Sequence, residues 1–367
     1  MAYSANSAGF KAISIDYFGD LDQKRMIKNI SLVRDLDRDF SAENLVLAAM
    51  DVPAGFLIYG ANLENYPQLI DLLSTKHTIL GNSSQALKKA RSIASLTQVL
   101  GKTDFSIPKS LFAAPQEEPA GRWLIKPSLS GGGIGIRQYK KNETVKKGEY
   151  LQQFVEGKTL SAVFLADGAK CLLLGITEQI VGAREYGADG YKWAGNIFPW
   201  NPMDEQFYKR IWEKIYCLIK ILSKNCGLKG LNCIDFILND TGIHLLEVNP
   251  RFSGSVELLE RYFGLSLLPW HITACMDGIL PDELDINLNK EKTIIKAVLY
   301  AEEDIVITDS DVFDRLLAHD IPHKCDRIDR GSPMCTIIRE GKTREECLEI
   351  IWSAVEQIKG CVYSYGS

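Results

Sequence analysis

Short apolar runs alternate with amphipathic segments through the first 110 residues. The apolar runs are typical of parallel strands buried on both faces, and the segments between and after them have helical spacing. We expect strands at 12–16, 55–59 and 77–80 and helices at 41–50, 64–74 and 83–100. Residues 1–9 also have the pattern of a helix that ends in glycine. The pattern predicts a doubly wound α/β lobe that opens on a helix rather than on a central strand.

The remaining residues form a short segment of strands and a longer α+β segment. A proline-containing stretch at 101–121 is expected to be a linker with a short extended piece near Ile107. The further elements are expected as strands at 122–127, 150–157, 161–166, 294–300 and 334–339, a hairpin at 231–251, and helices at 205–226, 255–277 and 343–359. Gly227 is the predicted end of the first of these helices. We expect three lobes, at 1–110, 111–166 and 167–367.

The hairpin near residue 240 carries acidic side chains on apolar strands. If its loop has three residues and ends in a left-handed glycine, Asn239 pairs with Ile243. Asp235 then lies directly opposite Glu247. Asn249, two residues further on, shares their face.

Two carboxylates at close range repel each other unless a cation lies between them. A set of Asp, Glu and Asn oxygens suits Mg²⁺, or Mn²⁺ in its place, rather than zinc. Arg251 follows the hairpin and supplies a planar fork for phosphate or carboxylate. The alternative is a surface hairpin whose carboxylates face water.

A glycine-rich loop follows the strand at 122–127. Lys126 precedes Ser-Leu-Ser-Gly-Gly-Gly-Ile-Gly at 128–135. Because glycine lets backbone amides approach an anion and lysine neutralises it, the segment predicts a phosphate-binding loop. A flexible hairpin is the alternative, and the spacing is not that of a Walker loop.

Composition narrows the class of protein. The chain has 367 residues, 46% of them hydrophobic and 24% charged, with a net charge of −5. This balance gives no basic field for nucleic acid, and no apolar run is long enough to span a membrane. None of the nine cysteines is spaced as Cys-x-x-Cys, so buried free thiols are expected rather than metal ligands. We expect a cytoplasmic protein without nucleic-acid or membrane partners.

The order and spacing of these motifs resemble the ATP-grasp superfamily over residues 10–345. After the α/β lobe come the lysine-led glycine loop, Gln-Gln-Phe-Val-Glu-Gly at 152–157, and an aspartate twelve residues before Glu-Val-Asn-Pro-Arg at 247–251. The chain is most similar to a branch of predicted carboligases related to biotin carboxylase, and to tyramine–glutamate ligases of methanogens. The resemblance implies an ATP-grasp fold with an N-terminal parallel-sheet lobe, a small lid lobe and a mixed C-terminal lobe.

The resemblance also implies a site for ATP and magnesium. Lys126 would bind the α- and β-phosphates. Glu247 and Asn249 would bind the metal, with Asp235 as a further or water-mediated ligand. Arg251 would face an acyl phosphate.

Other nucleotide contacts are implied at the loop and at the hinge between lobes. The loop residues that would close over the γ-phosphate are Ser130, Gly131, Gly132, Gly133 and Gly135. Gln152, Gln153 and Val155 would hold adenine, while Thr159 stands where the family usually has a ribose-binding glutamate. The candidates for an early basic residue at the α-phosphate are Lys88, Lys89 and Arg91.

This chemistry predicts an ADP-forming carboxylate–amine ligase that acts on a small acid and an amine through an acyl phosphate. A bicarbonate-using carboligase and a non-catalytic ATP-binding module are the alternatives. A homodimer is possible.

Three residues are candidates for contact with the acid or amine. Asp16 and Glu64 follow predicted strands and are expected to face Arg251, because ligands of open α/β sheets lie beyond the carboxyl ends of the strands. Capping of helices is the alternative for both acidic residues. Arg184 begins an aromatic and polar segment that extends to Trp200 and could line a ligand site.

Overall fold

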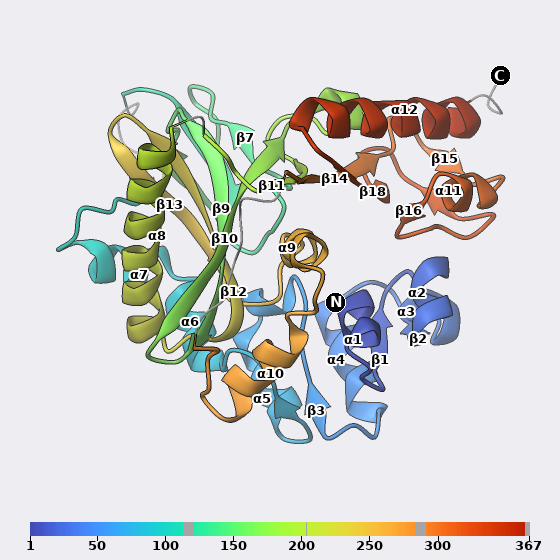
Figure 1. The fold of residues 1–367 in the computed structure, drawn as a ribbon, viewed down its shortest axis with the longest axis horizontal. Helices are drawn as coiled ribbons and strands as arrows, with labels where there is room; N and C mark the ends of the chain where they lie inside the picture. The colour runs from blue at the N-terminus through green and yellow to red at the C-terminus, as the bar shows by residue number, and fades with distance from the viewer. Residues whose placement is uncertain (113–119, 203, 283–290, 364–367) are drawn as a thin grey trace.

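An antiparallel sheet of eight strands forms the centre of the molecule (Figure 1). The computed structural model describes residues 1–112, 120–202, 204–282 and 291–363. The strands are β9 (Lys158–Asp167), β10 (Cys171–Val181), β11 (Trp193–Phe198), β12 (Lys229–Asn239), β13 (Gly242–Asn249), β14 (Thr293–Tyr300), β16 (Ala318–His319) and β18 (Pro333–Gly341). They lie side by side in the order β13, β12, β9, β10, β11, β14, β18 and β16.

Helices cover both faces of this sheet, because its strands alternate their side chains between two apolar cores. The helices are α8 (Glu205–Cys226), α9 (Val256–Phe263), α10 (Leu268–Met276) and α12 (Arg344–Tyr363). Ala162 and Phe164 of β9 pack in the core beneath α8, whereas Val163 and Leu165 pack in the core beneath α9 and α10. Helix α12 packs against β14 and β18. Figure 1 shows α8 and α9 on opposite sides of the sheet.

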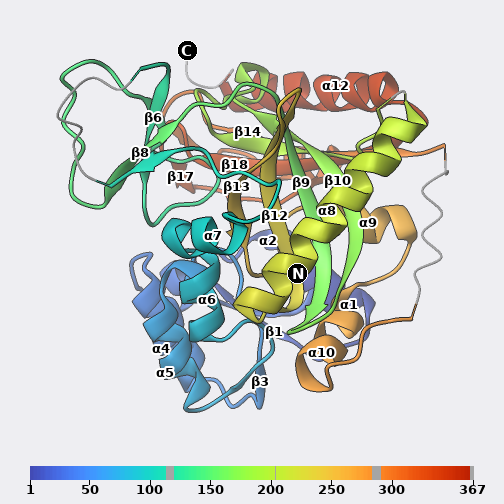
Figure 2. The same cartoon turned by 90° about the vertical axis from the view of Figure 1, so that its left-hand side faces the viewer.

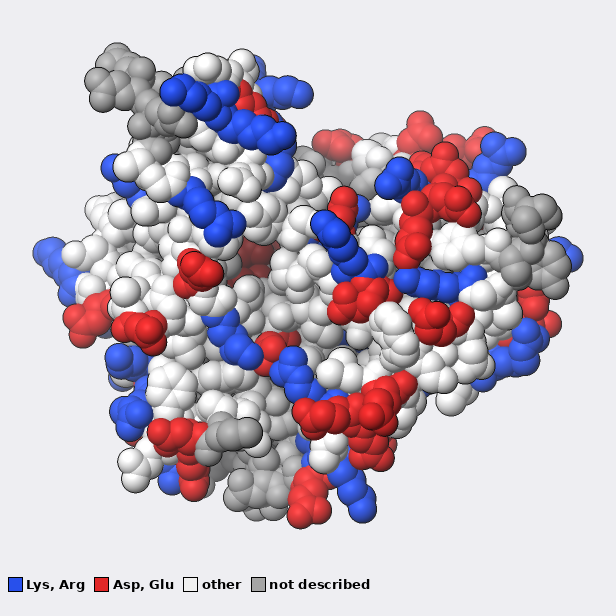
Figure 3. Space-filling view, turned by 90° about the horizontal axis from the view of Figure 1, so that it is seen from above, with Lys and Arg blue, Asp and Glu red and all other residues white. Residues whose placement is uncertain are grey.

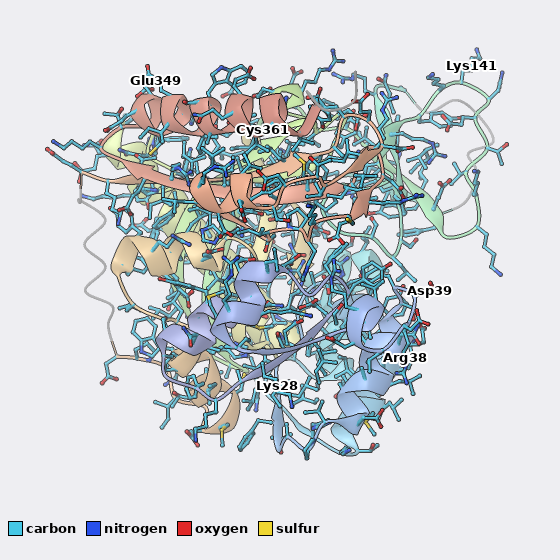
Figure 4. All side chains as sticks on the ribbon, turned by 90° about the vertical axis from the view of Figure 1, so that its right-hand side faces the viewer. Lys28, Arg38, Asp39, Lys141, Glu349 and Cys361 are labelled. Atoms are coloured by element: carbon cyan, nitrogen blue, oxygen red, sulfur yellow. The ribbon has the colours of Figure 1, made fainter. Side chains whose placement is uncertain are left out.

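A second antiparallel sheet forms a small lobe. Its strands are β5 (Ser110–Leu111), β6 (Trp123–Pro127), β7 (Arg137–Gln138) and β8 (Glu149–Gln153), in the order β5, β8, β6 and β7. Trp123, Ile125 and Leu151 form its core. Figure 2 shows this lobe projecting beyond the main sheet, and Lys141 marks its outer end in Figure 4, above Asp39 of the N-terminal lobe.

The N-terminal lobe contains two separate parallel pairs of strands, β1 with β2 and β3 with β4. Its elements are α1 (Ala2–Ser7), β1 (Ile13–Asp16), α2 (Leu21–Met26), β2 (Lys28–Ser31), α3 (Leu32–Asp35), α4 (Ala42–Asp51), β3 (Phe56–Leu57), η1 (Leu63–Asn65), α5 (Pro67–Ser74), β4 (Thr78–Ile79), α6 (Ser84–Ala90) and α7 (Ile93–Leu100). The prediction that these strands are buried is wrong, because Ile13 and Phe56 are exposed. The sequence pattern predicts helix α1 but does not predict strand β2.

One predicted helix matches the structure, and two others are each divided into two helices. Helix α8 spans the predicted residues, and Gly227 ends it in the left-handed conformation. The helix predicted at 83–100 is interrupted after Ala90, where Ser92 begins α7 by accepting a hydrogen bond from the backbone of Ser95. The helix predicted at 255–277 is two helices, because a left-handed Gly264 ends α9.

The two main sheets separate between β8 and β9. The sequence pattern grouped residues 158–166 with the small lobe, whereas β9 pairs with β10 and β12 in the large sheet. Residues 113–119 of the predicted linker lie outside the described part of the chain. The remaining short elements are η2 (Arg184–Tyr186), β15 (Ile305–Val306), α11 (Asp311–Arg315) and β17 (Arg327–Ile328). Among the described residues, no helix combines the length and apolar character needed to cross a membrane.

A buried amide joins the N-terminal lobe to the large sheet. Asn82 donates to Oδ1 of Asn232 at 2.8 Å and to the carbonyl oxygen of Pro250 at 2.9 Å. Its own Oδ1 accepts from the backbone of Lys229 at 2.8 Å. The hydroxyl of Tyr59 donates to the Asn82 carbonyl at 2.9 Å. Because Asn82 and Asn232 are fully enclosed, these bonds fix the lobe against the strand that carries the acidic hairpin.

His271 forms a second buried link between these parts. Its Nδ1 accepts from the backbone of Leu231 at 2.8 Å, and its Nε2 donates to the carbonyl oxygen of Leu80 at 3.0 Å. Burial lowers the pKa of His271 to about 4, although the bond to Leu80 opposes the shift. The ring is therefore neutral in the folded protein at neutral pH.

We predict that stability decreases as the pH falls from 6.5 toward 4. The folded pKa of His271 lies below its ordinary value of 6.5, so unfolding is accompanied by proton uptake in this window. The stability lost is up to about 3 kcal/mol. Urea unfolding at pH 7 and pH 5 measures it, with His271→Gln as the comparison. The variant should be less stable at pH 7 and depend less on pH, and an equal pH dependence in both proteins would contradict the assignment.

Candidate functional site

Strands β12 and β13 are joined by a tighter turn than the sequence predicts. Asn239 pairs with Gly242, which leaves two residues in the loop. The prediction of a three-residue loop with Asn239 opposite Ile243 is therefore wrong. A regular ladder from this turn would place Asp235 opposite Leu246.

A β-bulge restores the predicted register further along the hairpin. The ladder shifts by one residue next to Asp235, so that Asp235 lies directly opposite Glu247. A bulge inserts one extra residue into one strand and reverses the faces beyond it. The two carboxylates therefore share a face, as the sequence predicts, because the two irregularities compensate.

The carboxylate of Asp235 lies within a network of donors. Its Oδ1 accepts from the Ser161 hydroxyl at 2.5 Å and from the Gln179 amide at 2.9 Å. Its Oδ2 accepts from the Asn249 amide at 2.8 Å. Asn249 thus lies beside the two carboxylates, which brings the three predicted metal ligands together.

Burial and like charge shape the protonation of this pair. Burial, and then the charge of Glu247, raise the pKa of Asp235 to about 7. Burial alone would also raise the pKa of Glu247, but the charges of Arg91 and Lys126 outweigh it and hold that pKa below its ordinary value. The Glu247 side chain keeps 33% of its surface exposed, so its carboxylate remains accessible to an ion.

Arg91 is the early basic residue that reaches the acidic hairpin. Its Nη1 donates to Oε2 of Glu247 at 3.2 Å and to the Val248 carbonyl at 3.1 Å. Its Nη2 donates to Asn65 at 3.0 Å and to the backbone carbonyl of Ser130 at 3.3 Å. One guanidinium therefore connects the N-terminal lobe, the hairpin and the glycine loop.

The other two candidates point elsewhere. Lys88 and Lys89 are exposed on α6, and Lys89 donates to the Asn225 carbonyl at 3.4 Å.

Lys126 donates to Oε1 of Gln152 at 3.0 Å. Burial lowers the pKa of Lys126 and the charge of Glu247 opposes that shift.

The glycine loop contacts the segment before β11. The carbonyl of Gly132 accepts from the backbone of Trp193 at 2.9 Å. Gly133 has a left-handed φ of 72°, and a Cβ atom there would lie 1.8 Å from the carbonyl oxygen of Tyr191. Only glycine fits this close approach. The side chains of Leu129 and Ile134 are exposed.

The predicted adenine residues lie at the junction of the two sheets. Gln152 is buried at the end of β8 and donates from its amide to the Ser110 hydroxyl at 3.2 Å. Gln153 is exposed, and its backbone donates to the Lys109 carbonyl at 2.8 Å. Val155, on the segment that leads into β9, and Thr159, the second residue of β9, are both half-buried.

Arg251 forms a buried ion pair with Glu64. Its Nε lies 2.7 Å from Oε1 of Glu64, whose side chain is 2% exposed. Its Nη2 donates to Asn249 at 3.4 Å. Within the described residues, Oε2 of Glu64 is buried without a hydrogen-bond partner. The structure therefore places Glu64 opposite Arg251.

Asp16 and Arg184 are placed differently from Glu64. Asp16 accepts from the backbone of Gly19 at 2.7 Å and from the Asn29 amide at 2.6 Å, which braces the turn after β1. Asp16 therefore contacts the turn after β1 and neighbouring β2 rather than Arg251, and the N-cap of α2 is Asp20 rather than Asp16. Arg184 lies exposed on η2. Figure 3 shows acidic and basic side chains interleaved over the face of the molecule that it presents.

Sequence analysis missed Ser161 and Gln179, which hold the Asp235 carboxylate. Both are polar residues within long apolar strands, and Ser161 is fully buried. A buried polar side chain needs a partner, so this interruption of the apolar pattern was a usable signal. Their contact with Asp235 on β12 was not visible without the order of the strands.

The region that carries this site is similar to a known family. A family model described as an ATP-grasp domain matches residues 92–255. An uncharacterized protein of Methanocaldococcus jannaschii is 25% identical over 239 residues, which are 62% of this chain and 55% of that protein. The chain therefore spans about half the length of this curated relative.

Solved structures show the same fold. The biotin carboxylase domain of Hydrogenobacter thermophilus 2-oxoglutarate carboxylase, crystallised with ADP, magnesium and bicarbonate, has a TM-score of 0.70 at 18% identity. That likeness covers 97% of this chain and 86% of the other. An L-amino acid ligase of Bacillus licheniformis has a TM-score of 0.69 at 14% identity, covering 96% of this chain and 93% of the other.

We predict that Asp235→Asn stabilises the protein and weakens its response to magnesium. The substitution removes one of two like charges from a buried face. The melting temperature without metal should rise by on the order of 2 °C. Thermal melting with and without MgCl₂ and ADP measures both effects. A lower melting temperature combined with an unchanged magnesium response would contradict the metal assignment.

Proposed function

Because residues 92–255 are an ATP-grasp domain, we propose that the protein is an ADP-forming ligase that joins a carboxylate to an amine. The observation that supports this most is the convergence of Asp235, Glu247 and Asn249 on one strand face. Arg91 lies against the same carboxylates. A protein that only bound a nucleotide would have no need for all these groups together.

The residues present fit a magnesium ion. Glu247 and Asn249 would hold it, with Asp235 as a further ligand, since all three present oxygen atoms on one face. When bound, magnesium neutralises the triphosphate and relieves the repulsion between the two carboxylates. Burial, and then the charge of Glu247, raise the pKa of Asp235 to about 7, so a cation between the two carboxylates would favour the charged form of Asp235.

Three groups on this face are suited to the triphosphate. Lys126 and Arg91 would bind phosphate oxygens, and each now contacts a protein group, Gln152 or Glu247, that a phosphate could replace. The glycine loop would cover the γ-phosphate with backbone amides. Gln153 and Val155 at the junction of the sheets would flank adenine.

The reaction has two displacements. An oxygen of the acid attacks the γ-phosphorus and ADP leaves, which converts a poor leaving group into phosphate. The amine nitrogen then attacks the acyl carbon, inorganic phosphate leaves, and the amine releases a proton. Arg251 lies where it could bind the acyl phosphate, and its ion pair with Glu64 fixes the direction of the guanidinium. The protein contributes position and charge rather than covalent chemistry.

Bicarbonate is a second candidate for the acid. The similar biotin carboxylase domain was crystallised with bicarbonate, and Arg251 could bind carboxyphosphate in the same way as an acyl phosphate. The product would then be a carboxylated amine rather than an amide. Mass detection of the product separates the two reactions, because only the former contains carbon from labelled bicarbonate.

We predict that Lys126→Ala weakens binding of Mg–ATP by about tenfold or more, because a charge-assisted phosphate contact is lost. Glu247→Gln should reduce turnover by at least about 100-fold. Calorimetry and ADP release in the presence of amino acids and amines measure these effects. Glu213→Gln, on the exposed face of α8, is the control. Wild-type turnover in Glu247→Gln would refute the site, and bound ATP without ADP release for any acid and amine would favour a non-catalytic module.

Arg91→Ala should weaken ATP binding by about tenfold, whereas Lys89→Ala should leave it unchanged. The reason is that Arg91 lies beside the hairpin and the glycine loop while Lys89 faces α8. Arg91→Lys should recover part of the affinity because it keeps the charge. Weaker binding in Lys89→Ala with normal binding in Arg91→Ala would reverse the assignment.

A further inference from the structure

The glycine loop is held from two sides. On one side, Nη2 of Arg91 donates to the backbone carbonyl of Ser130 at 3.3 Å. On the other side, the backbone of Trp193 donates to the carbonyl of Gly132 at 2.9 Å. Arg91 belongs to the N-terminal lobe, and Trp193 begins β11 of the large sheet. The loop therefore lies between two bodies that the buried bonds of Asn82 join to each other.

The contact between the loop and the large sheet is a close approach of backbone atoms. A Cβ atom on Gly133, where φ is 72°, would lie 1.8 Å from the carbonyl oxygen of Tyr191 and 3.3 Å from the Cα atom of Lys192. The neighbouring Gly132 has a similar φ of 62°, but a Cβ atom there would meet no atom within 4 Å. Both backbone conformations favour glycine. At Gly133 the contact with Tyr191 requires it as well.

The segment that the loop contacts is braced by the C-terminal part of the chain. The hydroxyl of Tyr300, a residue that is 6% exposed, donates to the carbonyl of Trp193 at 2.7 Å. Nζ of Lys192 donates to the carbonyl of Gly331 at 3.1 Å and lies 5.5 Å from the centre of the Tyr300 ring. The carbonyl of Lys192 accepts from the backbone of Gly182 at 2.8 Å. These contacts fix the backbone of the segment independently of the loop.

Tyr191 contacts the small lobe at a second point. Its ring lies 6.4 Å from the ring of Phe154, which follows β8. The guanidinium of Arg122 lies 4.0 Å from the centre of the same Phe154 ring. Tyr191 therefore meets the glycine loop with its carbonyl group and the segment after β8 with its ring.

We propose that residues 191–193 form a docking seat for the glycine loop, and that Tyr300 is a positioning residue that holds this seat through the carbonyl of Trp193. The loop then occupies its covering position before a nucleotide arrives, so less ordering is needed when the γ-phosphate binds. The role of the seat in covering the γ-phosphate rests on the proposed ligase function. Docking of the loop on the seat does not.

Hydrogen exchange of the Trp193 amide measures docking in the nucleotide-free protein, because this N–H bonds to the loop. Gly133→Ala should speed the exchange by about tenfold or more, since the added methyl group would collide with Tyr191. Gly132→Ala is the matched control, because it introduces similar left-handed strain without a collision and should change the exchange far less. Equal effects of the two substitutions, or no effect of Gly133→Ala, would overturn the seat.

Tyr300→Phe should speed exchange of the Trp193 amide by about threefold or more, because the Trp193 carbonyl loses its donor. Amides of β9, in the centre of the large sheet, should exchange as in the wild type. Tyr208→Phe is the control, because Tyr208 lies on α8 and packs against a different core from that of Tyr300. Equal acceleration at Trp193 and in β9 would indicate a general loss of stability and would overturn the positioning role.

Nucleotide affinity tests what the seat does for the γ-phosphate. Because the proposed loop covers that phosphate, Tyr300→Phe should weaken binding of Mg–ATP by about threefold to tenfold and leave binding of Mg–ADP unchanged in calorimetry. Equal weakening of both nucleotides, or no weakening, would contradict the positioning role. Failure of the wild-type protein to bind Mg–ATP would contradict the proposed function instead, and exchange in the nucleotide-free variants would still decide whether the loop docks on the seat.

Discussion

Repulsion between two carboxylates is the constraint around which this site is built. Asp235 and Glu247 face each other across paired strands and are both partly buried. The protein stabilises one of them with hydrogen-bond donors from Ser161 and Gln179 and the other with the charge of Arg91. Because each carboxylate has its own partners, the pair is stable without a metal ion. A divalent cation between the two carboxylates would stabilise the pair further. Each of these contacts therefore stabilises one of the two carboxylates.

The contacts of Arg91 connect the acidic pair to the N-terminal lobe and to the glycine loop. The guanidinium lies between two helices, at the point where α6 ends and α7 has not yet begun. A continuous helix at 83–100 would carry the side chain on a regular helical face. The interruption instead lets Arg91 reach Asn65, the hairpin and the glycine loop together. The break in the helix therefore lets one guanidinium group contact three separate segments of the chain.

Much of the fold and of the arrangement of the acidic hairpin could be predicted from the sequence, because apolar spacing and strand alternation are local properties. Helix α8 and the facing of Asp235 and Glu247 follow from such spacing. The two-residue turn could not be distinguished from a three-residue loop, since the bulge that compensates for it has no side-chain signature. The partners of Asp235 on β9 and β10 depend on strand order, which is set by long-range packing rather than by spacing.

The buried bonds of Asn82 have a consequence for how the molecule could open and close. They connect the N-terminal lobe to β12, the first strand of the acidic hairpin, and His271 adds a second connection nearby. Separating these two bodies would expose several unpaired polar groups at once, so they are expected to move as one unit. In the proposed ligase the small four-stranded sheet would then be the part that moves, turning about residues 154–157. In that ligase, the release of ADP would require movement of this sheet and would set an upper limit on the turnover rate.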